Sequence, residues 1–313
     1  MQNSVVGLGT VKKQIIRVVF LTIVTACALF AQECVPFRIA TFNVRTPGDK
    51  APNDWQARVP RIRTLLEKYQ LDIIGVQELT PKQKAALLAS DTPYEAVGVG
   101  REVNQGGEQC CIFYRKDRFE CLENGTFWLS ETPEVVGSRS WNSACRRICT
   151  WAHLRDRLTG QTFLHFNTHL DHISEEARQK GAELILSRIE TMGQGLPCFL
   201  TGDLNCRAGS PAVQAILARM KDTKLASETL HEGPAQTFHA YHFNPDKPGK
   251  SEIDFIFFQG ELRVLKHITI SDHDGDEYPS DHFPVMAEVI FPPIAPPSLP
   301  GSAPAPPARP SGP

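Results

Sequence analysis

Six short stretches of this sequence place acidic, amide or imidazole side chains at the ends of apolar runs. The residues are Asn43, Glu78, His169, the pair Asp203 and Asn205, Asp254, and the adjacent Asp281 and His282. An acid and an imidazole side by side at the mouth of a strand favour phosphoester chemistry. One Asp-His dipeptide is weak evidence by itself, so the prediction depends on the other stretches lying close to it.

Two of these stretches are chemically dense. The run from Phe166 to His172 holds two imidazoles, a carboxylate and an amide within one turn, which is costly unless they bind something, although His172 could simply cap a loop. Asp203 and Asn205 are two residues apart, so in a strand they face the same side and could orient a water and a phosphoryl oxygen.

Asp254 heads the apolar run Ile253–Phe258, which makes it a buried acid. A buried carboxylate needs a partner, and His282 or His169 could supply one.

Apolar strand-like runs alternate with amphipathic helices between residues 37 and 290, which is the pattern of a layered α/β (α+β) enzyme. Short turns between neighbouring strands favour antiparallel pairing within mixed sheets. The expected strands are 37–44, 72–77, 94–99, 109–114, 118–129, 148–156, 162–169, 196–201, 253–258, 262–270 and 283–290. The expected helices are 55–69, with Val59, Ile62, Leu65 and Leu66 on one face, and 81–89, 174–193 and 211–220.

The chain of 313 residues, with 41% apolar residues, can bury one large core. A net charge of −2 gives no global basic field, so gripping a long nucleic acid by charge alone is not indicated, although a local basic patch stays open.

The two ends differ from the centre. Basic residues among 12–17 precede an apolar run, Val18–Ala26, that is too short to span a bilayer, so residues 1–31 are predicted to be an export signal, with a buried helix as the alternative. Cleavage after Ala26 would leave Cys27 for lipid attachment, whereas cleavage after Ala31 would give a secreted or periplasmic protein. The Pro-rich residues 292–313 are expected to be a disordered tail.

Nine cysteines are many for a reduced cytosolic enzyme and tolerable in an exported one. No zinc-ribbon spacing is present, and neither disulfide connectivity nor the number of free thiols can be read from the sequence.

In chain order, the six stretches resemble the motifs of the endonuclease/exonuclease/phosphatase superfamily, in its deoxyribonuclease-like branch, over about residues 37–290. The resemblance implies a four-layer α/β/β/α sandwich of two mixed β-sheets flanked by helices, with the active site at one edge of both sheets. The segment Phe127–Pro133, together with Arg147 and residues 167–172, is similar to an uncharacterised, largely bacterial branch.

The resemblance also implies roles. Glu78 resembles the principal Mg²⁺ ligand, with Asn43 and Asp281 close to the metal, and such oxygen ligands suit Mg²⁺ or Mn²⁺ rather than zinc. Arg147 resembles a phosphate-contacting arginine, with a plain surface arginine as the alternative.

The remaining family roles concern proton transfer and positioning. His282 resembles the imidazole that acts on the attacking water or contacts the phosphate, with Asp254 orienting it. Asp203 and Asn205 resemble the pair that positions the nucleophile and a phosphate oxygen, and His169 the second imidazole.

Two departures bear on the substrate. Arg45 stands where apurinic endonucleases have an acid, which disfavours abasic-site repair. Leu79–Pro81 lacks the arginine with which deoxyribonuclease enters the minor groove.

The sequence therefore predicts an exported, Mg²⁺-dependent phosphoester hydrolase, foremost a phosphodiesterase or nuclease acting on nucleic acid or nucleotides by in-line attack of water. The alternatives are a phospholipid or sphingomyelin phosphodiesterase, a sugar or inositol phosphatase, and a catalytically dead binding module. A monomer without an obligate protein partner is expected.

Overall fold

The computed structural model describes residues 34–293, except residues 90, 91, 248 and 250. The expected export signal, Cys27 and the proline-rich tail beyond Pro293 lie outside the described residues. Among the helices that are described, none has the length and apolar character needed to cross a membrane.

The first of two mixed six-stranded sheets has the order β11-β12-β1-β2-β4-β3. Within it, β1 and β2 are parallel and the other pairs are antiparallel. Its strands are β1 (Phe37–Asn43), β2 (Ile73–Leu79), β3 (Tyr94–Val97), β4 (Gln109–Arg115), β11 (Arg263–Thr269) and β12 (Val285–Ile290).

The second sheet has the order β5-β6-β7-β8-β10-β9, with β7 and β8 parallel. Its strands are β5 (Phe119–Trp128), β6 (Ile148–Asp156), β7 (Thr162–His169), β8 (Cys198–Asp203), β9 (Lys221–Asp222) and β10 (Asp254–Gln259).

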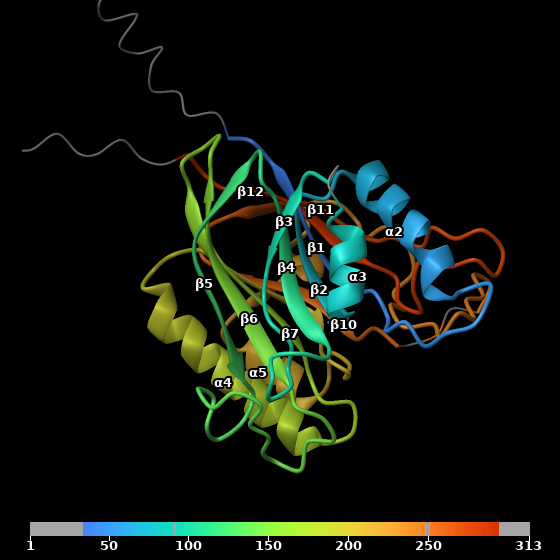
Figure 1. The fold of residues 1–313 in the computed structure, drawn as a ribbon. Helices are drawn as coiled ribbons and strands as arrows, with labels where there is room; N and C mark the ends of the chain where they lie inside the picture. The colour runs from blue at the N-terminus through green and yellow to red at the C-terminus, as the bar shows by residue number, and fades with distance from the viewer. Residues whose placement is uncertain (1–33, 90–91, 248, 250, 294–313) are drawn as a thin grey trace, which may run out of the picture. The chain divides into compact units, whose positions relative to one another are not determined.

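Helices cover the outer face of each sheet, so the described part of the chain is a four-layer α/β/β/α sandwich (Figure 1). Helices α2 (Trp55–Tyr69) and α3 (Pro81–Leu87) lie on the first sheet, and α4 (Glu175–Gly193) and α5 (Pro211–Leu217) on the second, with the short α6 (Thr223–Ala226) following β9. This confirms the expected fold class.

The core between the sheets is aromatic and aliphatic. The rings of Phe37 and Phe163 stack with centroids 5.6 Å apart, and the ring of Phe199 meets that of Phe37 edge-on at 5.9 Å. Removing such large side chains from water supplies much of the driving force that holds two sheets face to face.

A buried polar network crosses between the sheets close to their functional edge. Asn167 of β7 donates from Nδ2 to the carbonyls of Val76 and Cys111, at 3.0 and 2.9 Å, and its Oδ1 accepts from Gln77 Nε2 at 2.6 Å. Gly75 makes room for this network, because a Cβ there would lie 2.1 Å from Thr201 Oγ1 and 2.5 Å from Asn167 Oδ1. The network therefore sets the relative position of β2 and β7.

The sequence located most elements, and the differences are local. Helix α2 begins and ends where expected, but its buried face includes Arg58, while Val59 is only half-buried. Strand β8 continues to Asp203 because it is paired on both sides beyond the apolar run. The short β9 and α6 were not expected. The eight cysteines within the described residues are free.

Candidate active site

Strand ends from both sheets meet at one edge of the sandwich and bring the six sequence stretches together. Asn43, at the end of β1, is in register with Gln77 of β2, one residue before Glu78. In the second sheet, His169 pairs with Asp203, which pairs in turn with Asp254. Asp281 and His282 precede β12, beside β1 in the first sheet.

Three residues at this edge have left-handed backbones: Arg45 has φ 57°, Glu78 has φ 58° and Asn205 has φ 50°. At Glu78 the pairing of β2 with β4 is interrupted between Val76 and Leu79. Non-glycine residues pay a conformational cost in this region, and such residues concentrate where the chain must aim a side chain.

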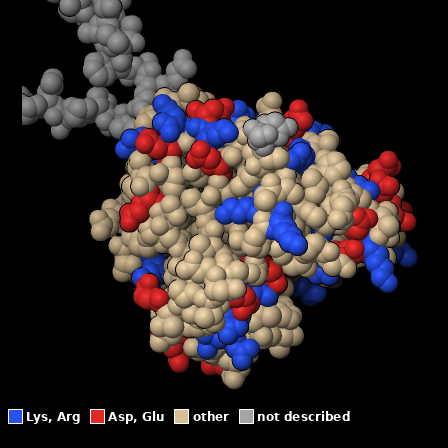
Figure 2. All heavy atoms as spheres, viewed as in Figure 1, with Lys and Arg blue, Asp and Glu red and all other residues tan. Residues whose placement is uncertain are grey.

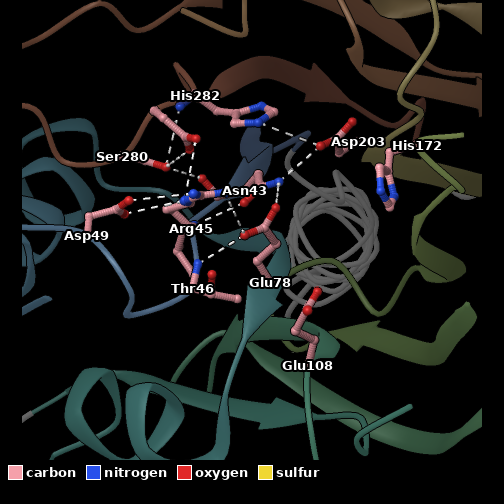
Figure 3. Close-up of polar contacts among 12 residues, drawn as sticks. Asn43, Arg45, Thr46, Asp49, Glu78, Glu108, His172, Asp203, Ser280 and His282 are labelled. Atoms are coloured by element: carbon pink, nitrogen blue, oxygen red, sulfur yellow. Dashed lines mark hydrogen bonds and ion pairs between the residues drawn. The ribbon is translucent and has the colours of Figure 1, made fainter. Parts of the chain in front are cut away.

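Asn43 joins the carboxylates of Glu78 and Asp203. Its buried Nδ2 donates to Glu78 Oε1 at 3.1 Å and to Asp203 Oδ2 at 2.9 Å, and its Oδ1 accepts from the Arg45 amide at 3.0 Å. The second Glu78 oxygen accepts from the Thr46 amide at 3.0 Å (Figure 3). Asn43 thus positions two acids from two sheets.

His282 is the cationic centre of a buried trio. Its Nδ1 lies 2.9 Å from Asp254 Oδ2, and its Nε2 lies 3.7 Å from Asp203 Oδ2. Burial disfavours the charged imidazole, but the two carboxylates outweigh it and raise the pKa of His282 to about 10. His282 is therefore protonated at neutral pH. Of the two imidazoles that the sequence offered as partners for Asp254, His282 is the one that contacts it.

Asp203 is poised between ionised and neutral forms. Burial, reinforced by the charge of Asp254, raises the pKa of Asp203 above the usual aspartate range. Its Oδ1 accepts from the Asn205 amide at 2.9 Å. A carboxylate of raised pKa, held by hydrogen bonds, is suited to accept a proton.

His169 lies on the other side of Asp203, with its Nε2 3.5 Å from Asp203 Oδ2 and 2.9 Å from Asn205 Nδ2. Burial, reinforced by Arg147, lowers the pKa of His169 well below its ordinary value, so this imidazole is neutral. Asn205 Nδ2 also donates to the Leu170 carbonyl at 3.0 Å. Both amide hydrogens of Asn205 are used, so contact with a phosphoryl oxygen requires exchange of the His169 bond.

Arg147 is not a surface arginine, since only 6% of it is exposed. Its Nη2 lies 2.9 Å from His172 Nδ1 and its Nε lies 3.5 Å from Asp171 Oδ2, while Nη1 has no hydrogen-bond partner among the described residues. Nη1 is buried, but Arg147 lines the same cleft as Glu78 and His282, so its positive charge attracts an anion there.

Asp171 stabilises this wall of the cleft. It accepts backbone hydrogen bonds from Ala144, Cys145, Ile173 and Ser174. Although burial opposes it, the backbone hydrogen bonds from Ser174, Ile173 and Ala144 and the hydrogen bond from the Ser143 hydroxyl lower the pKa of Asp171 below its usual range.

The cleft has a volume of about 400 Å³. Beyond the residues described above, its wall includes Arg101 and Glu108, which form a bidentate pair with nitrogen–oxygen distances of 2.9 and 2.6 Å. The lining also contains the phenyl ring of Phe238. The cleft is therefore small and mainly polar.

The donor atoms fit a hard divalent cation. The carboxylates of Glu78 and Asp281 already converge on one cation, the guanidinium of Arg45, and all their ligand atoms are oxygens, as Mg²⁺ or Mn²⁺ prefers. Ligand atoms of Asp203, Asp254 and His282 also come within 4.8 Å of one another. His282 is already paired with Asp254 and Asp203, whereas Glu78 and Asp281, with Asn43 beside them, offer only oxygen ligands, so they are the better candidates for a hard cation.

One positioning residue was missed by sequence reasoning. Arg58 of α2 is completely buried and donates to the carbonyls of Val44, Asn53, Arg45 and Thr46, the last three at 2.9, 3.2 and 2.9 Å. It holds the loop after β1 that carries Arg45. An arginine four residues before Ile62 on the apolar face of a predicted helix was the available signal.

A family model, the endonuclease/exonuclease/phosphatase family, matches residues 40–282. A solved structure from that family, from Bacteroides vulgatus, is 35% identical, with a TM-score of 0.77 over 82% of this chain and 100% of the other. A mannosyl-6-phosphatase from Bacteroides thetaiotaomicron is 33% identical, with a TM-score of 0.75 over 82% of this chain and 100% of the phosphatase.

A curated relative is more distant. Nocturnin from Drosophila melanogaster is 22% identical over 283 residues, which cover 76% of this chain and 42% of Nocturnin. The chain spans less than half the length of the curated relatives it matches.

Proposed function

The chain belongs to the endonuclease/exonuclease/phosphatase family, and we propose that it is a divalent-metal-dependent hydrolase that removes phosphate from a small polar phosphomonoester, such as a sugar phosphate. Members of this family are phosphoester hydrolases and generally depend on a divalent metal. The proposal concerns which phosphoester is the substrate and which residues act on it.

The observation that carries this proposal is the cleft. Its volume of about 400 Å³ is in the size range of small-molecule sites, roughly 300–1,000 Å³, and its lining is mostly charged or polar. The bidentate Arg101–Glu108 pair offers donors and acceptors to hydroxyl groups beyond the phosphate. The 33% identity to a mannosyl-6-phosphatase supports the same class of substrate.

The second candidate, a phosphodiester in nucleic acid, is less favoured by the surface. On the face drawn in Figure 2, basic and acidic side chains are intermixed and much of the area is uncharged. Single-stranded nucleic acid is usually held by a basic groove with several aromatic rings on which bases stack. Among the described residues that line this cleft, a single phenyl ring, that of Phe238, could stack on a base. A small monoester therefore fits better.

The proposed chemistry is an in-line displacement at phosphorus, in which a water oxygen bonds to phosphorus while the bond to the ester oxygen breaks. The leaving oxygen takes a proton from solvent and departs as an alcohol. A divalent cation held by Glu78 and Asp281, beside Asn43, would stabilise the negative charge that develops on the phosphoryl oxygens. Asp203, fixed by Asn43 and Asn205, accepts the proton of the attacking water. His282, protonated and oriented by Asp254, donates a hydrogen bond to a phosphoryl oxygen.

Arg147 completes the anion site from the second sheet. Asp171 and His172 hold its guanidinium, whose positive charge beside the cleft attracts the phosphate, and a shift of the side chain would let the buried Nη1 reach a phosphate oxygen. Neutral His169 keeps Asn205 beside Asp203 without adding a second cation next to His282.

A substrate panel tests the proposal. Phosphate release would be measured with Mg²⁺ from hexose 6-phosphates and p-nitrophenyl phosphate, beside bis-nitrophenyl phosphate, sphingomyelin and single- and double-stranded nucleic acids. We expect kcat/KM to be highest for a sugar phosphate. Faster cleavage of a diester than of every monoester would contradict the proposal and favour the nuclease or lipid alternatives.

A matched pair of substrates makes the panel sharper. In the Glu108→Gln variant, KM for the sugar phosphate should rise about tenfold, as expected for losing a charged hydrogen bond to a hydroxyl. KM for p-nitrophenyl phosphate should not change, because its leaving group carries no hydroxyl. An equal change for both substrates would show that Glu108 does not contact the sugar.

A further inference from the structure

Three carboxylates from separate segments surround the Arg45 guanidinium. Its Nε lies 3.3 Å from Asp49 Oδ2 and 3.6 Å from Asp281 Oδ2, and its Nη1 lies 3.9 Å from Glu78 Oε2. Figure 3 shows the Arg45 side chain between Asp49 and Glu78. Two of these acids, Glu78 and Asp281, are the candidate metal ligands.

Hydrogen bonds fix the backbone of Arg45, whereas its side chain is accessible to solvent. The amide donates to Asn43 Oδ1, and the carbonyl accepts from Gln83 Nε2 at 2.7 Å and from Arg58 Nη2 at 3.2 Å. The side chain, in contrast, is 39% exposed. Its contacts with the acids exceed 3 Å throughout, longer than a well-formed charge-assisted hydrogen bond of roughly 2.7–2.9 Å. The guanidinium can therefore leave by side-chain rotation alone.

The positive charge of Arg45 offsets the repulsion between the Glu78 and Asp281 carboxylates. Glu78 and Asp281 both lie within 4 Å of the Arg45 guanidinium, so without a cation between them two carboxylates would face each other and repel. One cation at this position stabilises the acids, and a second nearby is repelled.

We propose that the Arg45 guanidinium is a built-in counter-ion that occupies the Glu78–Asp281 site in the metal-free protein and competes there with the divalent cation. Binding of the ion moves the side chain away, and the resting protein binds metal more weakly than its carboxylates alone would. This inference rests on the proposed cation site.

Metal titration without substrate tests the competition. Mn²⁺ binding would be measured by calorimetry on chelator-stripped wild type and on Arg45→Gln. We expect Arg45→Gln to bind Mn²⁺ about tenfold more tightly, because removing one nearby, half-exposed positive charge lifts a repulsion of that order. Lys68→Gln, which removes one exposed charge distant from the cleft, should match wild type, as should the charge-conserving Arg45→Lys.

Thermal unfolding gives a second readout that does not depend on activity. In chelator, Arg45→Gln should melt below wild type, because its acids lose their counter-ion, and Mn²⁺ should raise its Tm by more than it raises that of wild type. Wild type that binds Mn²⁺ while Arg45→Gln binds it no more tightly would overturn the role of Arg45 alone. Failure of wild type itself to bind Mn²⁺ or Mg²⁺ would overturn the cation site as well.

Discussion

At the scale of single residues, the site separates into an acidic half and a cationic half. Glu78 and Asp281 gather around Arg45, while His282 holds its proton between Asp254 and Asp203. Asn43 links the halves by donating to both Glu78 and Asp203. In the proposed mechanism the cation would be held at the acidic half, while His282 would donate a hydrogen bond to the phosphoryl group and Asp203 would accept a proton from water.

Substitution of either half should stop turnover. We expect Glu78→Ala and His282→Ala each to lower kcat by at least about 10²-fold, because one removes an acid that would hold the cation and the other a charged hydrogen-bond donor. Steady-state phosphate release measures this loss. The two differ in metal binding: Glu78→Ala should weaken Mn²⁺ binding, whereas His282→Ala should not.

Near-normal turnover in either variant would remove that residue from the mechanism. Lys68→Ala, an exposed change distant from the cleft, serves as the control and should retain activity.

The sequence predicted these residues because each stands beside a recognisable apolar run, and the structure brings them to one edge. Their catalytic roles remain predictions. Arg58 could not be predicted in the same way, because its partners are backbone carbonyls of the loop after β1, and the path of that loop is not visible in residue types.

At the scale of elements, the site depends on how two sheets are held against each other. Strands β1 and β2 supply Asn43 and Glu78, whereas β7, β8 and β10 supply His169, Asp203 and Asp254. The polar network around Asn167 connects β2 to β7 and β8 just below that edge. Helix boundaries followed from local caps such as Asp54 and Ser174, but the pairing of sheets is long-range and could be anticipated only through the family resemblance.

Gly75→Ala tests this arrangement. Its new Cβ would meet Thr201 Oγ1 and Asn167 Oδ1, so the sheets must separate or the network must break. We expect the free energy of unfolding to fall by about 2–4 kcal/mol, as for overpacking combined with a lost buried hydrogen bond. Denaturant unfolding measures it, and activity should fall together with stability.

Gly209→Ala is the matched control, since nothing lies within 4 Å of its added Cβ. Equal stability of the two variants would show that the inter-sheet contact tolerates a methyl group and that the network does not set the spacing.

At the scale of the whole molecule, the described domain has the α/β/β/α sandwich of its family, and its loops form a small, polar cleft. The resemblance seen in six separated motifs is confirmed by the family match over residues 40–282 and by the two mixed sheets. The substrate was harder to predict than the fold. The cleft walls come from loops around Arg101, Cys145 and Phe238, and only the complete fold brings these loops together.

The most direct test of the account is phosphate release from a hexose 6-phosphate by the chelator-stripped full-length protein, before and after addition of Mg²⁺ or Mn²⁺, beside Glu78→Gln. We expect no release in EDTA, recovery with either ion, and at least about a 10²-fold lower rate in Glu78→Gln under the same conditions. Release that survives chelation, or that is equal in Glu78→Gln, would contradict a metal-dependent hydrolase centred on Glu78.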